Sequence, residues 1–387
     1  MDERGRLYFD NAATSFPKPT EVYDAMDRFA RTYAGGAGRS AHEHAIAGAR
    51  LMFELRNELA ALLGGEAERL VFTKSATEAL NLVLRGVLSR GAKVMCGPLE
   101  HNAVARPLAH LAAENEVVVR QAVGDEHGRM TPAALDEALA AGVVDAVVTL
   151  HASNVHGLAQ DLSALGEVCR QHDVLFIVDA AQSAGALPLD ARAMHIDALC
   201  VTGHKALLGP TGTGALLLSP RLAERLPPLL HGGTGSVSEQ ERMPDFLPDR
   251  LEAGTPNTHG LAGLLAGVRY VARRTVAEIE AHDRALRERL LGCLRAIPGL
   301  RLLGDASGPA TSTVSFTGPL PAGDFARLLS ERYGVAVRAG LHCAARAHRT
   351  LGTFPTGAVR LSPGLFTPPD AIDEVCAAVA EIAKARP

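Results

Sequence analysis

The chain has 387 residues, of which 47% are hydrophobic and 21% are charged, a balance typical of a globular protein and unlike that of a disordered chain. Lysine and arginine total 39 against 43 aspartate and glutamate, giving a net charge of −4 without any basic run, so nucleic acid is not an expected partner. No apolar stretch reaches the ~18 residues of a membrane span, and the charged N-terminus is unlike a signal peptide. We therefore expect a cytoplasmic protein with no membrane contact.

Short apolar runs alternate with helix-length segments between residues 70 and 220. The runs that predict strands are 70–73, 93–96, 117–120, 146–150, 175–179, 198–202 and 215–219. Strands that are apolar on both faces and separated by helices are typical of a parallel sheet covered on both sides. The sequence therefore predicts a doubly wound α/β core.

The rest of the chain predicts a second, smaller domain. The Gly- and Pro-rich stretch 231–250 is expected to be a long loop with a functional or interfacial role. The apolar helical period from about 258 to 290 predicts one bent helix linking two domains, and the mixed strands and helices after it predict an α+β unit. We expect a large domain at 16–257 and a small one at 258–387, with segment 1–15 packing near the latter.

The cysteines of this chain lie far apart and show neither a C-x-x-C pair nor a metal-type spacing. We therefore expect free thiols in a reducing compartment and no metal site. Most lie in apolar, periodic segments, where cysteine behaves as a small hydrophobe. Cys343 instead lies in the loop AGLHCAARAH, after the run GVAVR, where a thiol is accessible enough to attack a substrate.

Lys205 and Asp179 both follow predicted buried strands. Lys205 sits on a glycine-flanked turn after IDALCVT, where loss of hydration favours a neutral amine and Schiff-base chemistry. A solvated loop lysine is the alternative. Asp179 ends the run LFIVD, at the strand end where α/β proteins bind ligands. It needs a cationic partner, such as a protonated pyridine nitrogen, unless it caps the next helix.

The segment TKSATEALNLV places small and hydroxyl residues between a strand and a helix. Free N–H groups at such a helix start suit a phosphate, although serine and threonine also cap many helices. A strand-end aspartate, a lysine behind the next strand and a phosphate-ready helix start together indicate a pyridoxal phosphate site.

The chain resembles the cysteine desulfurases, pyridoxal-phosphate-dependent enzymes with the class V aminotransferase fold, over nearly its whole length. The segments that carry the resemblance are, in order, YFDNAATSFPKP, VFTKSATEALNL, EHNAVARPL, HASNVHG, VDAAQSAG, TGHKALLGPTGTG, EAGTPNT, AVRAGLHCA and LGTFPTGAVRLSPG. The resemblance implies transferase fold type I, with a large, mostly parallel sheet domain and a smaller α+β domain.

The resemblance also implies how the cofactor is held. Lys205 would carry pyridoxal phosphate as a Schiff base and later move the substrate Cα proton, and Asp179 would pair with the pyridine nitrogen. His101 would stack on the ring, with a helix-capping histidine as the alternative. Thr255 would reach the phosphate of a neighbouring subunit, which implies a homodimer. The other implied cofactor contacts are Ala76, Thr77, Asn154, Gln182, Thr202 and His204.

The implied substrate side centres on Cys343, as the persulfide-forming nucleophile, and Arg360, as the group that grips the substrate carboxylate. A structural ion pair is the alternative for Arg360. The other residues implied to lie near the substrate are Arg338, His42, Asn11, Ala12 and Ala13. The chain departs from the family in having Ala76 at a phosphate position where related enzymes have threonine, and Ala339 and Ala345 where threonine and proline are more usual.

The activity implied is conversion of L-cysteine to L-alanine, with the sulfur left on Cys343 for an acceptor protein. Selenocysteine lyase and cysteine sulfinate desulfinase are the nearest alternatives, whereas an aminotransferase has no need for the loop cysteine. A catalytically retired sulfur carrier on the same fold is disfavoured by the presence of Lys205, Asp179, His101 and Arg360 together. A nicotinamide-dependent dehydrogenase would need G-x-G-x-x-G after its first strand, and GPTGTG is spaced differently.

Overall fold

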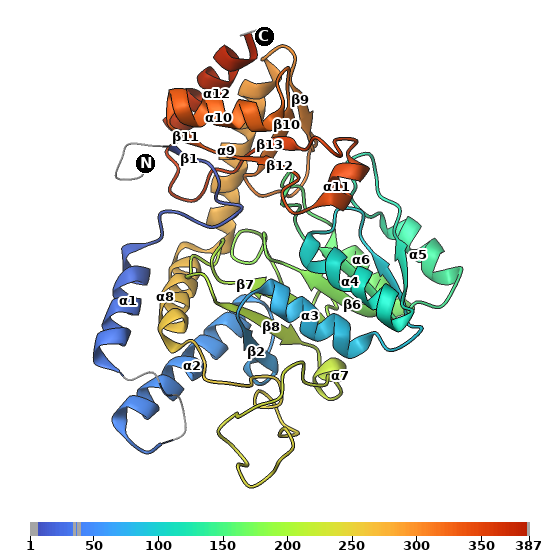
Figure 1. Ribbon diagram of the computed structural model, residues 1–387, viewed down its shortest axis with the longest axis vertical. Helices are drawn as coiled ribbons and strands as arrows, with labels where there is room; N and C mark the ends of the chain where they lie inside the picture. Colours follow the sequence, from blue (N-terminus) through green and yellow to red (C-terminus); the bar gives the residue numbers. More distant parts are fainter. Residues whose placement is uncertain (1–6, 34–35, 37–39, 385–387) are drawn as a thin grey trace.

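The structure is a computed structural model that describes residues 7–33, 36 and 40–384. Residues 1–6 of the predicted N-terminal segment and 385–387 of the predicted small domain lie outside the described residues. The described part of the chain forms a seven-stranded sheet, a four-stranded sheet and a two-stranded pair. In Figure 1 the seven-stranded sheet, here called the large sheet, lies in the lower half of the molecule, and the four-stranded or small sheet lies above it.

The large sheet is mostly parallel, as the apolar runs predict. Its order is β2 (Leu70–Thr73), β8 (Gly214–Leu218), β7 (Ala198–Thr202), β6 (Leu175–Asp179), β5 (Ala146–Leu150), β3 (Lys93–Cys96) and β4 (Val118–Gln121). The strands from β7 to β4 run parallel, and β8 is antiparallel to both of its neighbours. Because β2 is antiparallel to β8, and β8 is antiparallel to β7, β2 runs in the same direction as β7. β2 therefore ends at the same edge of the sheet as β5, β6 and β7.

The central strands of the large sheet are buried at every residue, because helices cover both faces of the sheet. One face packs against α3 (Ala76–Val87), α4 (Asn102–Asn115) and α7 (Pro220–Ala223). The other face packs against α1 (Thr20–Thr32), α2 (Glu43–Leu62), α5 (Pro132–Ala140), α6 (Leu162–Gln171) and α8 (Thr258–Arg274). A single 3-10 turn, η1, spans Ala67–Arg69 in the described part. The predicted doubly wound core is confirmed.

The segment from residue 258 to about 290, for which the apolar period predicts one bent helix, is divided between two helices. α8 ends at Arg274, and α9 (Val276–Arg295) begins after Thr275, whose φ of 67° breaks the helix. The Thr275 side chain then accepts a hydrogen bond from the N–H of Glu278 and caps α9. α8 packs on α1 and α2, whereas α9 packs on α12 (Pro369–Lys384). The division of the chain into domains at 257 and 258 stays a prediction.

The small sheet is antiparallel, in the order β12 (Arg338–Gly340), β13 (Ala358–Leu361), β10 (Val314–Thr317) and β9 (Arg301–Leu303). Residues of α9, α10 (Ala322–Tyr333) and α12 share its core. A short helix, α11 (Ala345–Thr350), follows the loop that carries Cys343. Beside this sheet, β1 (Leu7–Tyr8) pairs in parallel with β11 (Val335–Ala336), so these two N-terminal residues lie near the small sheet (Figure 1).

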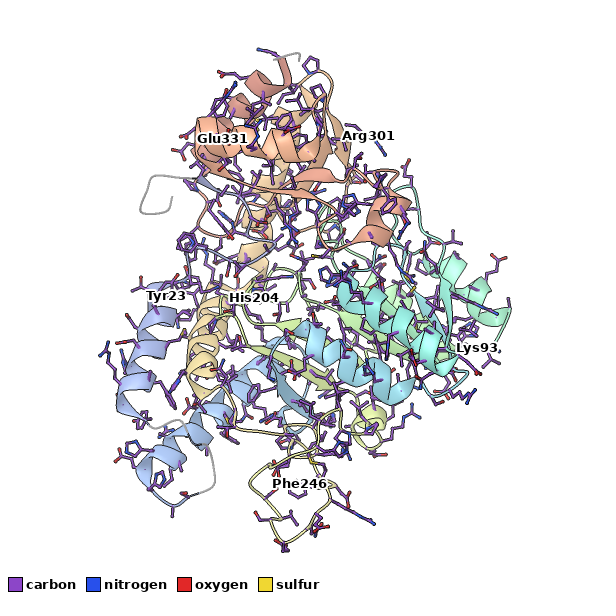
Figure 2. All side chains as sticks on the ribbon, viewed as in Figure 1. Tyr23, Lys93, His204, Phe246, Arg301 and Glu331 are labelled. Carbon is purple, nitrogen blue, oxygen red and sulfur yellow. The ribbon has the colours of Figure 1, made fainter. Side chains whose placement is uncertain are left out.

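Residues 224–257, all of which the structure describes, form no helix or strand. This segment includes the predicted loop at 231–250 and projects away from the large sheet, with Phe246 near its tip (Figure 2). Within the described residues, no helix combines the length and the apolar character needed to cross a bilayer.

Candidate active site

A cavity of about 210 Å³ lies where β6 and β7 of the large sheet end, facing the small sheet. This is the crevice position at which open α/β sheets bind ligands. It brings together most of the residues singled out from the sequence, namely Ala12, Ala13, Ala76, Thr77, His101, Asn154, Asp179, Gln182, Thr202, His204, Lys205, Arg338 and Arg360. The cavity wall also contains Ser75, which caps α3 and was not predicted as a site residue.

Asp179 closes β6 and is 5% exposed. One carboxylate oxygen accepts a hydrogen bond of 2.9 Å from the N–H of Ala181. Burial raises the pKa of Asp179, while the Ala181 N–H and the charge of Lys205 lower it. The carboxylate therefore lies in a place where a cation, supplied by lysine or by a ligand, is favoured.

Lys205 follows β7 after Gly203 and His204. A Cβ atom at Gly203 would lie 2.1 Å from Oγ1 of Thr213, so this turn requires glycine. Burial lowers the pKa of Lys205 to about 8, and Asp179 opposes the shift while Arg360 adds to it. A substantial fraction of the amine is therefore neutral, and nucleophilic, at mildly alkaline pH.

The peptide just before Lys205 is held by the chain start. The carbonyl oxygen of His204 accepts hydrogen bonds from the N–H of Ser15 at 3.0 Å, Oγ1 of Thr14 at 3.1 Å, Oγ of Ser15 at 3.2 Å and Nζ of Lys18 at 3.5 Å. Burial lowers the pKa of Lys18 to about 8. In Figure 2, His204 lies at the level where the two halves of the molecule meet. Residues 14–18 thus fix the direction in which the Lys205 turn enters the cavity.

His101 caps a helix, as one of the two alternatives from the sequence has it, and it also lines the cavity. Its stacking on a cofactor ring stays a prediction. Its Nδ1 accepts a 3.0 Å hydrogen bond from the N–H of Ala103, which caps α4, and the same side chain lines the cavity. Burial first, and then the charge of Lys205, lower the pKa of His101 to about 4. The imidazole is therefore neutral at pH 7, with an orientation fixed by the cap.

Ala76 and Thr77 are the first residues of α3, which follows β2. The N–H groups of a first helical turn have no intrahelical partners, so they present donors and a positive dipole end to the cavity. Ser75 accepts a 3.3 Å hydrogen bond from the N–H of Glu78 and leaves the N–H groups of the first two helical residues for another acceptor.

Arg360, on β13, is fully buried. Its Nη2 lies 2.6 Å from Oδ1 of Asp10, and its Nη1 donates to the carbonyl of Asn154 at 2.9 Å. Burial lowers the pKa of Arg360, and Asp10 opposes that shift. Asp10 is a residue of this site that sequence reasoning missed. A fully buried guanidinium requires an anion, but the burial of Arg360 is evident only in the folded chain, so the sequence alone gives no signal for this pair.

Cys343 lies in the loop between β12 and α11, with an exposed thiol 3.1 Å from Nη2 of Arg338. The loop backbone is strained, because His342 and Cys343 have φ values of 49° and 57°, a left-handed conformation that costs about 1–2 kcal/mol for each L-residue. Two hydrogen bonds of 2.7 Å hold it: Nδ2 of Asn154 donates to the carbonyl of His342, and the N–H of Asn102 donates to the carbonyl of Cys343.

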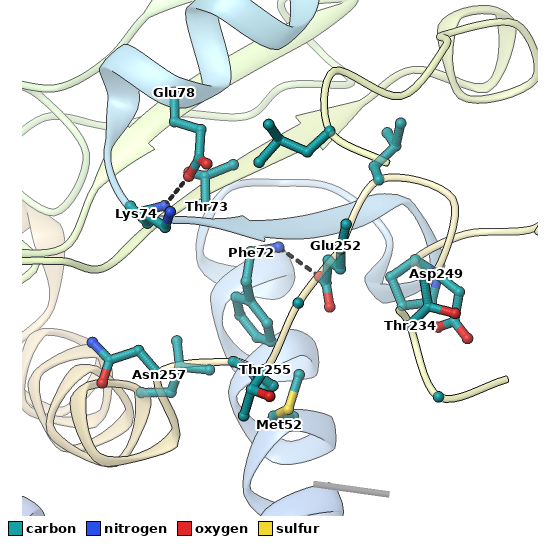
Figure 3. Close-up of a pocket in the computed structure, with 18 of the residues that line it drawn as sticks. Met52, Phe72, Thr73, Lys74, Glu78, Thr234, Asp249, Glu252, Thr255 and Asn257 are labelled. Atoms are coloured by element: carbon teal, nitrogen blue, oxygen red, sulfur yellow. Dashed lines mark hydrogen bonds between the residues drawn. The ribbon is translucent and has the colours of Figure 1, made fainter. Parts of the chain in front are cut away.

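Three residues predicted for this site lie elsewhere in the isolated chain. Asn11 lines an adjacent cavity of about 60 Å³ and donates to the carbonyl of Ser362. His42 is exposed and caps α2 through the N–H of Ala45. Thr255 lines a separate cavity of about 470 Å³, between α2, β2 and the segment before α8 (Figure 3). Across the described ranges, no three His, Cys, Asp or Glu side chains are grouped as a metal site.

Comparison with known proteins identifies the family to which this chain belongs. Residues 7–375 match the family described as aminotransferase class-V. A probable cysteine desulfurase of Methanothermobacter thermautotrophicus is 34% identical, over 92% of this chain and 88% of that protein. A probable cysteine desulfurase of Pyrococcus abyssi is 31% identical, over 98% of this chain and 94% of that protein.

Solved structures give the same result. The apo cysteine desulfurase of Thermococcus onnurineus superposes with a TM-score of 0.92 at 30% identity, over 98% of this chain and 95% of that one. The cysteine desulfurase CsdA of Escherichia coli, in an S-sulfonic acid form, gives 0.86 at 28% identity, over 97% and 94%.

Proposed function

Because the chain belongs to the aminotransferase class-V family and, within it, to the cysteine desulfurases, we propose that it is a pyridoxal-phosphate-dependent cysteine desulfurase. It converts L-cysteine to L-alanine and carries the sulfur as a persulfide on Cys343. The observation that carries this proposal is one cavity lined by Lys205, Asp179 and Arg360, with the Cys343 thiol in contact with Arg338 of the same wall.

Members of this family depend on pyridoxal phosphate, and the residues of the cavity fit that group. Asp179 suits a protonated pyridine nitrogen, and the start of α3 suits a phosphate. The cavity also holds buried polar atoms that have no partner among the described residues, namely Asn154 Oδ1, Thr202 Oγ1, His204 Nδ1 and Arg360 Nε. When bound, the cofactor supplies an electron sink for the charge left by the Cα proton.

In the proposed reaction, Nζ of Lys205 would hold the cofactor and, when free, would accept the Cα proton of the substrate. Its lowered pKa suits both steps. Arg360 binds the substrate carboxylate, a task for which its fork of N–H groups is suited. Neutral His101 would pack against the cofactor ring, and Gln182 and Asn154, which line the same cavity, would contact its hydroxyl.

Cys343 then attacks the substrate sulfur as a thiolate. The bond between Cβ and sulfur of the substrate breaks, and a new bond joins that sulfur to Sγ of Cys343. The protons released in the earlier steps complete alanine. In sum, L-cysteine and the Cys343 thiol become L-alanine and a Cys343 persulfide. Arg338 stabilises the thiolate through its contact with Sγ. Because Cys343 is exposed, the persulfide can pass to an acceptor protein.

The decisive experiment compares wild type with Cys343→Ser on L-cysteine. The variant keeps the side-chain volume and the cofactor site, but its hydroxyl stays protonated at neutral pH. Wild type should release alanine and show a mass increase of one sulfur on the peptide that contains Cys343, and the variant should bind L-cysteine yet release almost no alanine. Near-normal alanine release by the variant would contradict the proposed mechanism. Activity of the variant on L-selenocysteine would favour a selenocysteine lyase.

We also propose a homodimer in which Thr255 completes the site of the neighbouring subunit. This assignment is supported by the position of Thr255 outside its own Lys205 cavity. Thr255→Glu, which would repel a phosphate, and Lys205→Ala should each be inactive alone. Mixed after mild dissociation, they should regain activity, because one of the two sites in each hybrid is intact. No recovery in hybrids shown to form would contradict the shared site.

A further inference from the structure

Residues 96–102, which connect β3 to α4, form a seat for the helix that follows Cys343. Nη1 of Arg346, on α11, lies 2.9 Å from Sγ of Cys96. Oγ1 of Thr350, at the end of the same helix, donates to the carbonyl of Pro98 at 2.9 Å. Figure 1 shows α11 directly above the helices of this part of the large sheet. The loop of Cys343 and the helix after it are therefore attached to one short stretch of the large sheet.

An apolar cluster accompanies these polar contacts. Leu99 is fully buried and packs with Ala344, Ala347 and Leu351 of the small-sheet part. These side chains are small or aliphatic and give the contact no direction of their own. The polar contacts therefore determine how α11 is oriented on the seat.

The seat also contains a buried acid, Glu100, whose pKa is affected by the charge of Arg346. Glu100 is fully buried, and its Oε1 accepts a 3.1 Å hydrogen bond from the N–H of Leu150 while its Oε2 has no partner in the described part of the chain. Burial and the charge of Asp179 raise the pKa of Glu100, and Arg346 acts in the opposite direction. The Cys96 thiol feels the same pair of charges. Arg346 is thus electrostatically linked both to the seat and, through Glu100, to the end of β6.

We propose that Arg346 is a positioning residue that latches α11, and with it Cys343, over the cavity by reaching Cys96 beside Glu100. The inference rests on the proposed function, because the thiol is positioned for attack on the substrate sulfur. In the latched state the thiol lies beside Arg338 of the cavity wall. In the unlatched state the strained backbone at His342 and Cys343 relaxes, and the persulfide is more accessible to an acceptor than it is in the latched state.

The first test does not depend on catalytic activity. In Arg346→Ala, hydrogen–deuterium exchange should accelerate at least about fivefold in peptides covering 100–104 and 341–351, because the N–H of Asn102 loses its acceptor on Cys343 whenever the loop opens. Arg346→Lys should restore part of the protection. Arg349→Ala is the matched control, since Arg349 lies on the same helix but stacks on Phe354. Exchange in Arg346→Ala equal to that in wild type and in the control would overturn the latch.

The second test separates positioning from general damage by two rates that move in opposite directions. Arg346→Ala should slow formation of the Cys343 persulfide in a single turnover, with kcat falling about tenfold and KM for L-cysteine unchanged. The same variant should speed removal of the preformed persulfide sulfur by a water-soluble phosphine, which becomes the phosphine sulfide. Loss of both rates, or no change in either, would contradict the proposal.

Cys96→Ala gives an independent approach to the same contact. It should accelerate exchange in the same two peptides, and the double variant with Arg346→Ala should add little, because the two side chains form one contact. Fully additive effects would overturn the pairing. If wild type forms no persulfide from L-cysteine, the proposed function fails, and the exchange experiments still decide whether the latch exists.

Discussion

The two walls of the Lys205 cavity are built in different ways. The wall at the end of the large sheet carries Asp179, the last residue of β6, and Lys205, which follows β7 after Gly203 and His204; both strands are buried at every residue. The opposite wall has one buried strand, β13, but it also includes the partly exposed β12 and the Cys343 loop, whose thiol is exposed. Groups on rigid, buried strands keep their geometry, whereas an exposed loop held by a few contacts opens at low free energy. The wall that carries Asp179 and Lys205, here called the platform, is thus fixed, whereas the opposite wall includes an adjustable loop that carries Cys343.

The largest effect is expected on the platform. Lys205→Ala removes the amine proposed to attach the cofactor and to move the proton, so turnover of L-cysteine should fall by at least about 10⁴-fold. The visible absorption of covalently held cofactor should disappear with it. Borohydride reduction followed by peptide mass spectrometry checks this. A reduced pyridoxyl group on another lysine of the variant would show that the attachment site is wrong.

On the opposite wall, Arg360→Ala should weaken L-cysteine binding by about 2–4 kcal/mol without releasing the cofactor, because a charge-assisted contact to the carboxylate is lost. Initial-rate measurements should show this as a raised KM. The substitution also leaves Asp10 without its partner. The double variant with Asp10→Ala should therefore recover stability but not binding, and an unchanged KM in either variant would exclude the role of Arg360.

Between the walls, Asp283 of α9 lines the small cavity beside Lys205 and is 7% exposed. Burial raises the pKa of Asp283 to about 7. The carboxyl is neutral in both states below about pH 4, and above pH 7 the folded state must bury its charge. Stability should therefore fall by about 2–4 kcal/mol as pH rises from 4 to 7. Urea unfolding of Asp283→Asn should lack this slope, and equal pH profiles for the two proteins would contradict it.

The smallest effect concerns the phosphate end of the platform. Thr77→Ala should weaken pyridoxal phosphate binding by about 1 kcal/mol, the usual contribution of one hydrogen bond. Ala76→Thr should strengthen it by a similar amount by adding a hydroxyl at the start of α3. Equilibrium dialysis of the apo variants measures both. Identical cofactor affinities in all three proteins would place the phosphate away from α3.

The central strands of the large sheet could be predicted from the sequence because each is a short, continuous apolar run, whereas the edge strand β4 ends in Arg120 and Gln121 and is largely exposed. Asp179 and Lys205 follow from their positions at or just after the ends of two central strands. The partners of the opposite wall could not be predicted in the same way. Asp10 and Arg360 are joined only by the folded chain, and neither has a local signal for the other. The break at Thr275 also has no glycine or proline to mark it, so the helical period continued through it.

The chain start holds parts of the molecule that a ribosome makes at very different times. Leu7 pairs beside Val335, and Asp10 with Arg360, although the later residues are synthesised roughly 330–350 residues afterwards, a delay of more than about 15 s at ordinary elongation rates. Until then, the segment that secures the carbonyl of His204 has no strand to pair with. An unfinished chain that ends before β12 also lacks Arg338, Cys343 and Arg360, so the proposed persulfide cannot form before synthesis of the chain is nearly complete.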